Sequence, residues 1–159
     1  MTFRTPDLLD AHPTLEACEA GLRHFGGRRR FHGPAATLRC FEDNSHVREW
    51  LKTPGQGRVL VIDGGGSRRC ALVGDVLAAA ALENGWAGIV LHGCVRDTVV
   101  LGTLDLGVMA LDVQPRRSEK HGQGARDVDL EILGARVRPG DWVYADEDGV
   151  VFSQRPLFA

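Results

Sequence analysis

Residues 74–97 read GDVLAAAALENGWAGIVLHGCVRD, and this stretch decides the predicted fold. Residues 76–83 are rich in alanine and other strong helix formers, and Asn84-Gly85 supplies a helix stop. Residues 88–92 form a short apolar run that begins at a glycine, which is typical of a buried strand. The stretch therefore predicts a helix followed directly by a buried strand.

A second apolar run lies upstream, at residues 59–62, and is closed by Asp63 and three glycines. This pattern predicts a buried strand that ends in a tight loop. The order strand, helix, strand implies a parallel pair joined by a right-handed crossover. Because parallel strands share one carboxyl edge, segments 64–75 and 93–97 should meet there, where open α/β sheets bind ligands.

Asp75 opens the predicted helix, and two interpretations of it stay open. Its carboxylate can cap the helix by accepting a backbone N–H. The same geometry leaves the N–H groups of Asp75, Val76 and Leu77 free to cradle a carboxylate or phosphate, with Gly74 as the preceding turn residue.

Arg96 and Asp97 follow the second strand and also admit two interpretations. Arg96 is either a solvated cation or a fork for a planar carboxylate or enolate, and Asp97 is either a helix cap or a site acid. Adjacent residues within a strand point to opposite faces. The pair can therefore serve one site only if it lies beyond the last paired residue, in the turn.

Composition favours one soluble domain over residues 1–159, since this length can bury a substantial core. The formal charge of −2 gives no global field for nucleic acid. No apolar stretch reaches the roughly 20 residues that span a bilayer, and no signal segment is evident. The four cysteines lack C-x-x-C spacing, which argues against zinc and favours reduced thiols in a cytoplasmic protein.

The remaining segments are predicted to be scaffold. Arg28-Arg29-Arg30 is expected in a solvated loop, with an oligomer contact or an acidic partner as alternatives. The other expectations are a first helix over 6–21, a strand over 37–41, a helix from Asn44 or Ser45 to Leu51, a strand over 108–113, a mobile loop or interface over 115–127, strands within 128–137 and 141–152, and a turn of solvated acids at 146–148.

Several motifs together resemble the regulator of ribonuclease activity A (RraA) family, which includes 4-hydroxy-4-methyl-2-oxoglutarate aldolases. The resemblance covers nearly the whole chain and is specific as a set. The motifs are Phe25-Gly26-Gly27-Arg28, Cys40-Phe41-Glu42-Asp43-Asn44, Val61-Ile62-Asp63-Gly64-Gly65-Gly66-Ser67, Gly85-Trp86-Ala87-Gly88, His92-Gly93-Cys94-Val95-Arg96-Asp97 and Tyr144-Ala145-Asp146-Glu147-Asp148-Gly149.

The resemblance implies roles for individual residues. In the aldolases a Gly-Asp-x-Leu turn binds pyruvate through backbone amides, an arginine contacts it, and the next aspartate holds a divalent metal. Those positions match Gly74-Asp75-Val76-Leu77, Arg96 and Asp97. Longer aldolases add a glutamate from a C-terminal extension, so we expect another group to take its place here.

The resemblance also implies an α/β fold of the swivelling β/β/α type with a parallel βαβ core, assembled as a homotrimer. It implies cleavage of 4-hydroxy-4-methyl-2-oxoglutarate to pyruvate with Mg²⁺ or Mn²⁺, and oxaloacetate decarboxylation through the same enolate. The alternative is a protein-binding inhibitor of ribonuclease E. A methyltransferase, suggested by the glycines after Asp63, fits poorly because a nucleotide-binding turn should lead straight into a helix.

Overall fold

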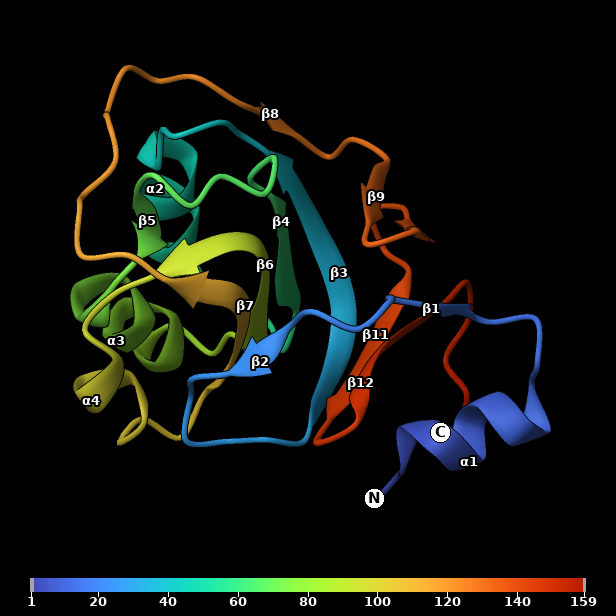
Figure 1. Cartoon of the computed structure of the whole chain (residues 1–159). Helices are drawn as coiled ribbons and strands as arrows, with labels where there is room; N and C mark the ends of the chain where they lie inside the picture. Colours follow the sequence, from blue (N-terminus) through green and yellow to red (C-terminus); the bar gives the residue numbers. More distant parts are fainter. Residues whose placement is uncertain (1, 159) are drawn as a thin grey trace.

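The computed structural model describes residues 2–158, and parallel strands lie side by side at its centre (Figure 1). Their order is β3-β4-β6-β7, with a short β5 beside the carboxyl-terminal part of β6. The bounds are β3 (Phe31–Arg39), β4 (Val59–Asp63), β5 (Ala71–Val73), β6 (Gly88–Val95) and β7 (Gly107–Val113).

Antiparallel strands extend this sheet on both sides and curl it, as Figure 1 shows. Beyond β3 come β11, β12 and β1, and β2 pairs with β7 at the other end. A separate hairpin is formed by β9 and β10. The bounds are β1 (Glu16–Ala17), β2 (Arg23–His24), β8 (Ala125–Arg126), β9 (Leu130–Ile132), β10 (Ala135–Val137), β11 (Trp142–Asp146) and β12 (Gly149–Ser153).

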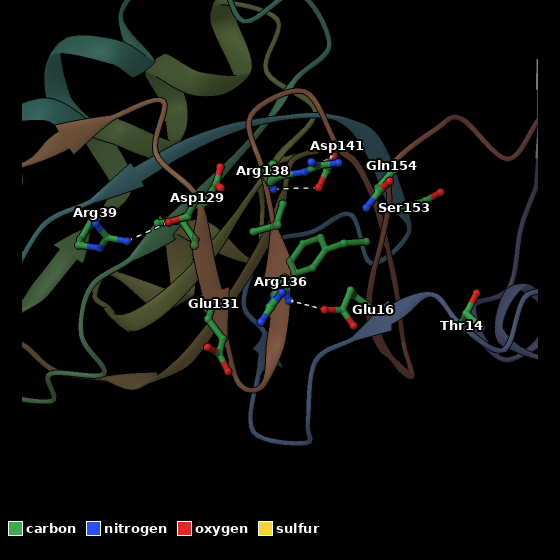
Figure 2. A pocket seen from close by; sticks show the side chains of 13 residues that line it. Thr14, Glu16, Arg39, Asp129, Glu131, Arg136, Arg138, Asp141, Ser153 and Gln154 are labelled. Atoms are coloured by element: carbon green, nitrogen blue, oxygen red, sulfur yellow. Dashed lines mark hydrogen bonds and ion pairs between the residues drawn. The ribbon is translucent and has the colours of Figure 1, made fainter.

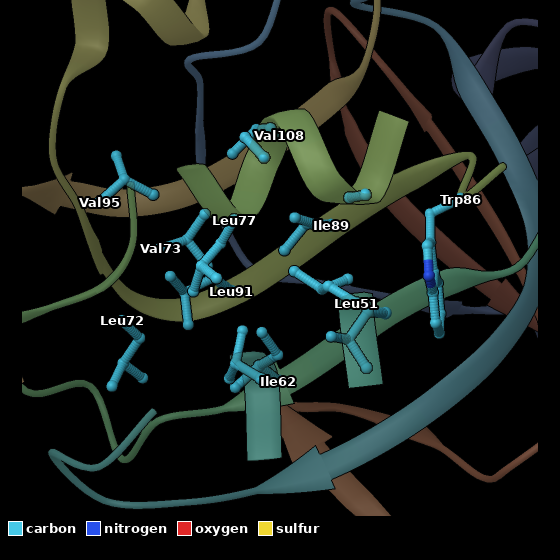
Figure 3. Packing of buried hydrophobic residues seen from close by; sticks show 14 of the residues in the cluster. Leu51, Ile62, Leu72, Val73, Leu77, Trp86, Ile89, Leu91, Val95 and Val108 are labelled. Atoms are coloured by element: carbon cyan, nitrogen blue, oxygen red, sulfur yellow. The ribbon is translucent and has the colours of Figure 1, made fainter. Parts of the chain in front are cut away.

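The parallel strands are covered on both faces, which explains their unbroken apolar sequences. Helices α2 (Ser45–Leu51), α3 (Asp75–Glu83) and α4 (Thr98–Leu101) lie on one face, and the β9–β10 hairpin lies on the other (Figure 1). Side chains alternate along β4. Leu60 and Ile62 pack with the helices, while Val59 and Val61 pack toward the hairpin. Figure 3 shows the helix-side core.

The predicted α/β class and its parallel βαβ core are confirmed, since β4, α3 and β6 follow in order and β4 pairs with β6 in parallel. The predicted helix over 6–21 is wrong. Helix α1 (Thr5–Ala11) stops before Pro13, because a residue that precedes proline is driven out of the helical region. The chain then runs extended and pairs with β12.

The strand predicted over 37–41 is longer and displaced, since β3 begins at Phe31 and ends at Arg39. The turn of acids at 146–148 was predicted to be solvated, but its first member is buried. The Asp146 carboxylate accepts hydrogen bonds from the Thr5 amide at 2.6 Å and the Thr5 hydroxyl at 2.7 Å. These bonds tie the N-terminal helix to the β11–β12 hairpin.

Between residues 2 and 158, no helix is both long and apolar enough to cross a membrane.

Candidate functional site

Arg96 and Asp97 lie in the turn directly after β6, as the prediction required. The Arg96 amide donates to the Val73 carbonyl at 3.0 Å, which places it beside the end of β5. Asp97 adopts the left-handed conformation, with φ 59° and ψ 42°, and precedes α4. Aspartate is among the few residue types that tolerate this region. The left-handed turn lets two adjacent side chains face one cavity.

The Asp97 carboxylate reaches the start of α3. Its Oδ2 accepts a hydrogen bond from the Asp75 amide at 3.1 Å, and the Arg96 Nε lies 3.9 Å from the same oxygen. The N-cap of α3 is Gly74, whose carbonyl accepts the first helical bond from Ala78. Thus the turn after β6 and the first turn of α3 form one constellation.

Gly74 is required for this close approach. A Cβ added there would lie 2.6 Å from Asp97 Oδ2 and 3.3 Å from Arg96 Cγ. The φ of Gly74 is −129°, which any residue can adopt. The constraint on this glycine is therefore space beside the two side chains, and not backbone conformation.

The amides at the start of α3 are partly engaged. The Asp75 amide donates to Asp97, and the Val76 amide donates to Asp75 Oδ1 at 2.8 Å. Asp75 is therefore not the helix cap, since Gly74 holds that position and makes no side-chain capping bond. Carboxylates already bind the amides, and an incoming carboxylate would take over contacts of the same kind.

All six residues singled out from the sequence line one cavity of about 180 Å³: Gly74, Asp75, Val76, Leu77, Arg96 and Asp97. The cavity also contains cations that sequence reasoning missed. They are Arg48 of α2, Lys52 at its C-cap, and Arg117 and Lys120 of the segment before β8. With Arg96 they make five cations against the carboxylates of Asp75 and Asp97. The cavity therefore carries three excess positive charges, although the chain as a whole is negative.

A spacing signal could have found two of these cations. Arg48 lies in α2, and Lys52 caps its end in the helical conformation four residues later, so the two lie on one side. Arg117 and Lys120 had no such signal, because their segment was predicted only as a mobile loop or interface. Arg117 is held by a bridge to Ala71, and the part that carries Lys120 is held by the contacts of Asp43.

Asp43 fixes the segment that carries Lys120. Its buried carboxylate accepts hydrogen bonds from the amides of Ser45 at 2.9 Å, His121 at 2.6 Å and Gln123 at 3.3 Å. Burial alone would raise the pKa of Asp43, but these hydrogen bonds lower it to about 2. An ionised carboxylate therefore joins the start of α2 to the loop across the cavity.

Cys94, two residues before Arg96, is fully buried. Burial raises the pKa of its thiol, so the reactive thiolate is disfavoured. Among residues 2–158, no three His, Cys, Asp or Glu side chains gather to form a ready-made metal cage. A metal at this site would rest on few protein carboxylates and several waters, as Mg²⁺ commonly does.

A larger cavity of about 750 Å³ lies beside the β9–β10 hairpin (Figure 2). It contains none of the residues predicted for the site. Its cations Arg39, Arg136 and Arg138 are outnumbered by four carboxylates. Arg39 is also satisfied, since it donates to the Asp129 carbonyl at 2.8 Å. Of these two cavities, the smaller one therefore has the excess of cations that an anion-binding site requires.

The structure is thus that of a small α/β protein with an arginine and an aspartate beside a helix start, at the edge of a curled sheet. The RraA-like family model, described as Aldolase/RraA, matches residues 5–152. The chain belongs to this family, and it is 58% identical over 158 residues to a protein of Laribacter hongkongensis named "Putative 4-hydroxy-4-methyl-2-oxoglutarate aldolase", with 99% of both sequences covered.

Two solved structures have nearly the same fold. The RNA-processing inhibitor RraA from Thermus thermophilis has a TM-score of 0.96 and 48% identity, covering 100% of this chain and 97% of that one. A protein of Geobacillus kaustophilus, described as an S-adenosylmethionine: 2-dimethylmenaquinone methyltransferase, has a TM-score of 0.95 and 51% identity, covering 98% and 97%.

The glycine-rich loop after β4 lacks the context of a nucleotide-binding turn in this chain. The loop leads into β5, and α3 begins only at Asp75. Gly64 and Gly66 instead donate backbone hydrogen bonds to the His92 carbonyl, each at 3.1 Å. These hydrogen bonds hold the loop against β6.

Proposed function

We propose that the protein is a divalent-metal-dependent aldolase that cleaves 4-hydroxy-4-methyl-2-oxoglutarate to pyruvate, and that it decarboxylates oxaloacetate through the same pyruvate enolate. The observation that carries the proposal is the convergence of Arg96, Asp97 and the start of α3 on one cavity. The names of the curated relatives support the aldolase class.

Arg96 would bind the carboxylate and stabilise the enolate oxygen of pyruvate. Its side chain is 41% exposed at the cavity wall, so its N–H groups can reach a ligand. The guanidinium is a planar fork that matches a carboxylate or enolate, whereas a lysine presents a single point charge. The amides at the start of α3 would orient the same carboxylate.

Asp97 would hold the metal. Its carboxylate is a hard oxygen ligand of the kind that Mg²⁺ and Mn²⁺ prefer, and 37% of the side chain is exposed beside the cavity. A bound ion would supply Lewis-acid stabilisation of the charge that develops on the keto oxygen. The residues present therefore fit the implied metal.

The excess positive charge fits the proposed substrates, because both 2-oxo acids carry two carboxylates. One carboxylate would lie at Arg96 and the start of α3. Arg48, Lys52 and Lys120 line the same cavity and offer counter-charges for the other. No histidine lines the described cavity, so we assign removal of the C4 hydroxyl proton to a water molecule.

A coupled pyruvate assay tests the proposal. Purified protein is given oxaloacetate or 4-hydroxy-4-methyl-2-oxoglutarate with Mg²⁺ or Mn²⁺, and the assay is repeated with chelator. We expect pyruvate from both substrates, lost on chelation and restored by added metal. Activity that persists in excess chelator would exclude the metal mechanism, and no pyruvate from either substrate would exclude the aldolase.

Gly74→Ala is expected to reduce pyruvate release at least tenfold while leaving the fold intact. Its Cβ would push the ends of the Asp97 and Arg96 side chains out of place, and small misplacements at a site cost about 10²-fold in rate. The expected loss is in kcat/KM, measured beside thermal unfolding. Gly102→Ala is the control, because its φ of −65° suits alanine and an added Cβ there comes no closer than 3.5 Å to its neighbours. Full activity of Gly74→Ala would show that this close approach is dispensable.

A second candidate function is the inhibition of a ribonuclease by protein binding, and the Thermus thermophilis structure favours it. A pull-down with purified ribonuclease E beside the pyruvate assay separates the two functions.

We also propose a homotrimer. The exposed apolar side chains of Val76 (71%) and Val99 (86%), on α3 and α4, give a second copy a surface to cover. Light scattering that returns a monomer would contradict the trimer.

A further inference from the structure

A second basic cavity, of about 520 Å³, adjoins the candidate site. Four arginines line it: Arg68 and Arg69 before β5, and Arg116 and Arg117 after β7. It shares Arg117 and Ser118 with the smaller cavity, but its other lining residues are different. The two cavities are therefore neighbours that share one part of their walls.

Backbone contacts hold the two arginine pairs in a fixed relation. The Ala71 amide donates to the Arg116 carbonyl at 2.7 Å, and the Gln114 side-chain amide donates to the Arg68 carbonyl at 2.9 Å. Cys70, between the segments, is buried and lines the cavity. The backbones of the two arginine segments are thus fixed relative to each other. This lowers the entropy cost of ordering the arginines around a ligand.

The acids in this cavity balance only part of the positive charge. Glu42 pairs with Arg69 at 2.6 Å, and Arg68 lies 3.9 Å from Asp112, which also pairs with Arg23. Within residues 2–158, neither Arg116 nor Arg117 has a carboxylate oxygen within 4.0 Å. Four arginines against Glu42 and Glu119 leave two excess positive charges.

We propose that this cavity binds a small polyanion with two or more negative groups close together, such as a diphosphate or a tricarboxylate. A monocarboxylate would cancel only half of the excess charge. Arginine forks bind both phosphate and carboxylate oxygens, often through two parallel hydrogen bonds. The site is independent of the proposed aldolase activity, since its ligand need not react.

Isothermal titration calorimetry of the whole protein tests the proposal, with pyrophosphate, citrate and acetate as probes. Arg68→Gln/Arg116→Gln removes one arginine from each segment and leaves Arg117, which lines the candidate active site. Arg29→Gln/Arg136→Gln is the matched control, because it removes the same charge from residues outside the cavity. Arg116→Gln alone is a second variant for the case in which the double variant fails to fold.

We expect saturable binding of pyrophosphate or citrate, no binding of acetate, and an affinity at least about tenfold weaker in the cavity variants, since each lost charged hydrogen bond commonly costs a factor of this size. Binding of pyrophosphate alone would assign the site to phosphate compounds, and binding of citrate alone to polycarboxylates. Absence of binding to both, or equal weakening in the control, would overturn the proposal.

Discussion

Replacing Arg96 by alanine should lower kcat/KM for pyruvate release by about 100- to 1000-fold, the usual cost of deleting one preorganised charge stabiliser. The fold should survive. The Arg96 contact with Val73 uses the backbone amide, which alanine keeps. Its side chain makes a 3.4 Å hydrogen bond to the Pro115 carbonyl and a 3.9 Å ion pair with the neighbouring Asp97, both at the surface. Steady-state kinetics with oxaloacetate, beside thermal unfolding, measures both effects.

The Arg96→Lys variant separates charge from shape. Lysine keeps the positive charge and loses the planar fork, so its activity should lie between that of alanine and that of the native chain. If Arg96→Ala retains more than about a tenth of native turnover, the rate loss is too small for a charge stabiliser. Arg96 would then have no role in the mechanism.

Replacing Asp97 by asparagine should abolish tight binding of Mn²⁺ and reduce pyruvate release by about 100-fold or more. Asparagine has the same shape and also tolerates the left-handed conformation, so φ 59° at this position adds little strain to the variant. The change therefore removes the negative charge with little effect on the turn. Calorimetric titration with Mn²⁺ and the pyruvate assay give the two readouts.

Asp10→Asn is the matched control, because Asp10 is an exposed acid of α1 that lies outside the cavity. It should bind Mn²⁺ and release pyruvate like the native chain. Native Mn²⁺ affinity in Asp97→Asn would mean that the metal is held elsewhere. Native activity would remove Asp97 from catalysis altogether.

The local sequence was sufficient to predict the central strands and the helix between them. The runs at 59–62 and 88–92 are apolar throughout because their strands are buried on both faces, and Asn84-Gly85 ends α3 as predicted. Prediction failed at the edges. The predicted helix ran past Cys18 because the local sequence favours helix. Instead, Pro13 ends α1, and residues 16–17 pair with β12. Such pairing across the chain leaves little local signal.

The candidate site shows the same division. The convergence of Gly74, Arg96 and Asp97 could be predicted, because a parallel βαβ unit brings both loops to one edge. The left-handed turn at Asp97 could not, since it depends on contacts with the start of α3. Arg117 and Lys120 were also missed. The position of Lys120 follows from Asp43, which binds residues about 80 positions away, and that of Arg117 follows from its bridge to Ala71.

A crystal structure of the protein soaked with Mn²⁺ and pyruvate would test the assignment of Asp97 and Arg96. We expect one anomalous-scattering peak at bonding distance from the Asp97 carboxylate, with the pyruvate carboxylate between Arg96 and the first turn of α3. A well-occupied manganese site without Asp97, or pyruvate bound away from Arg96, would contradict it.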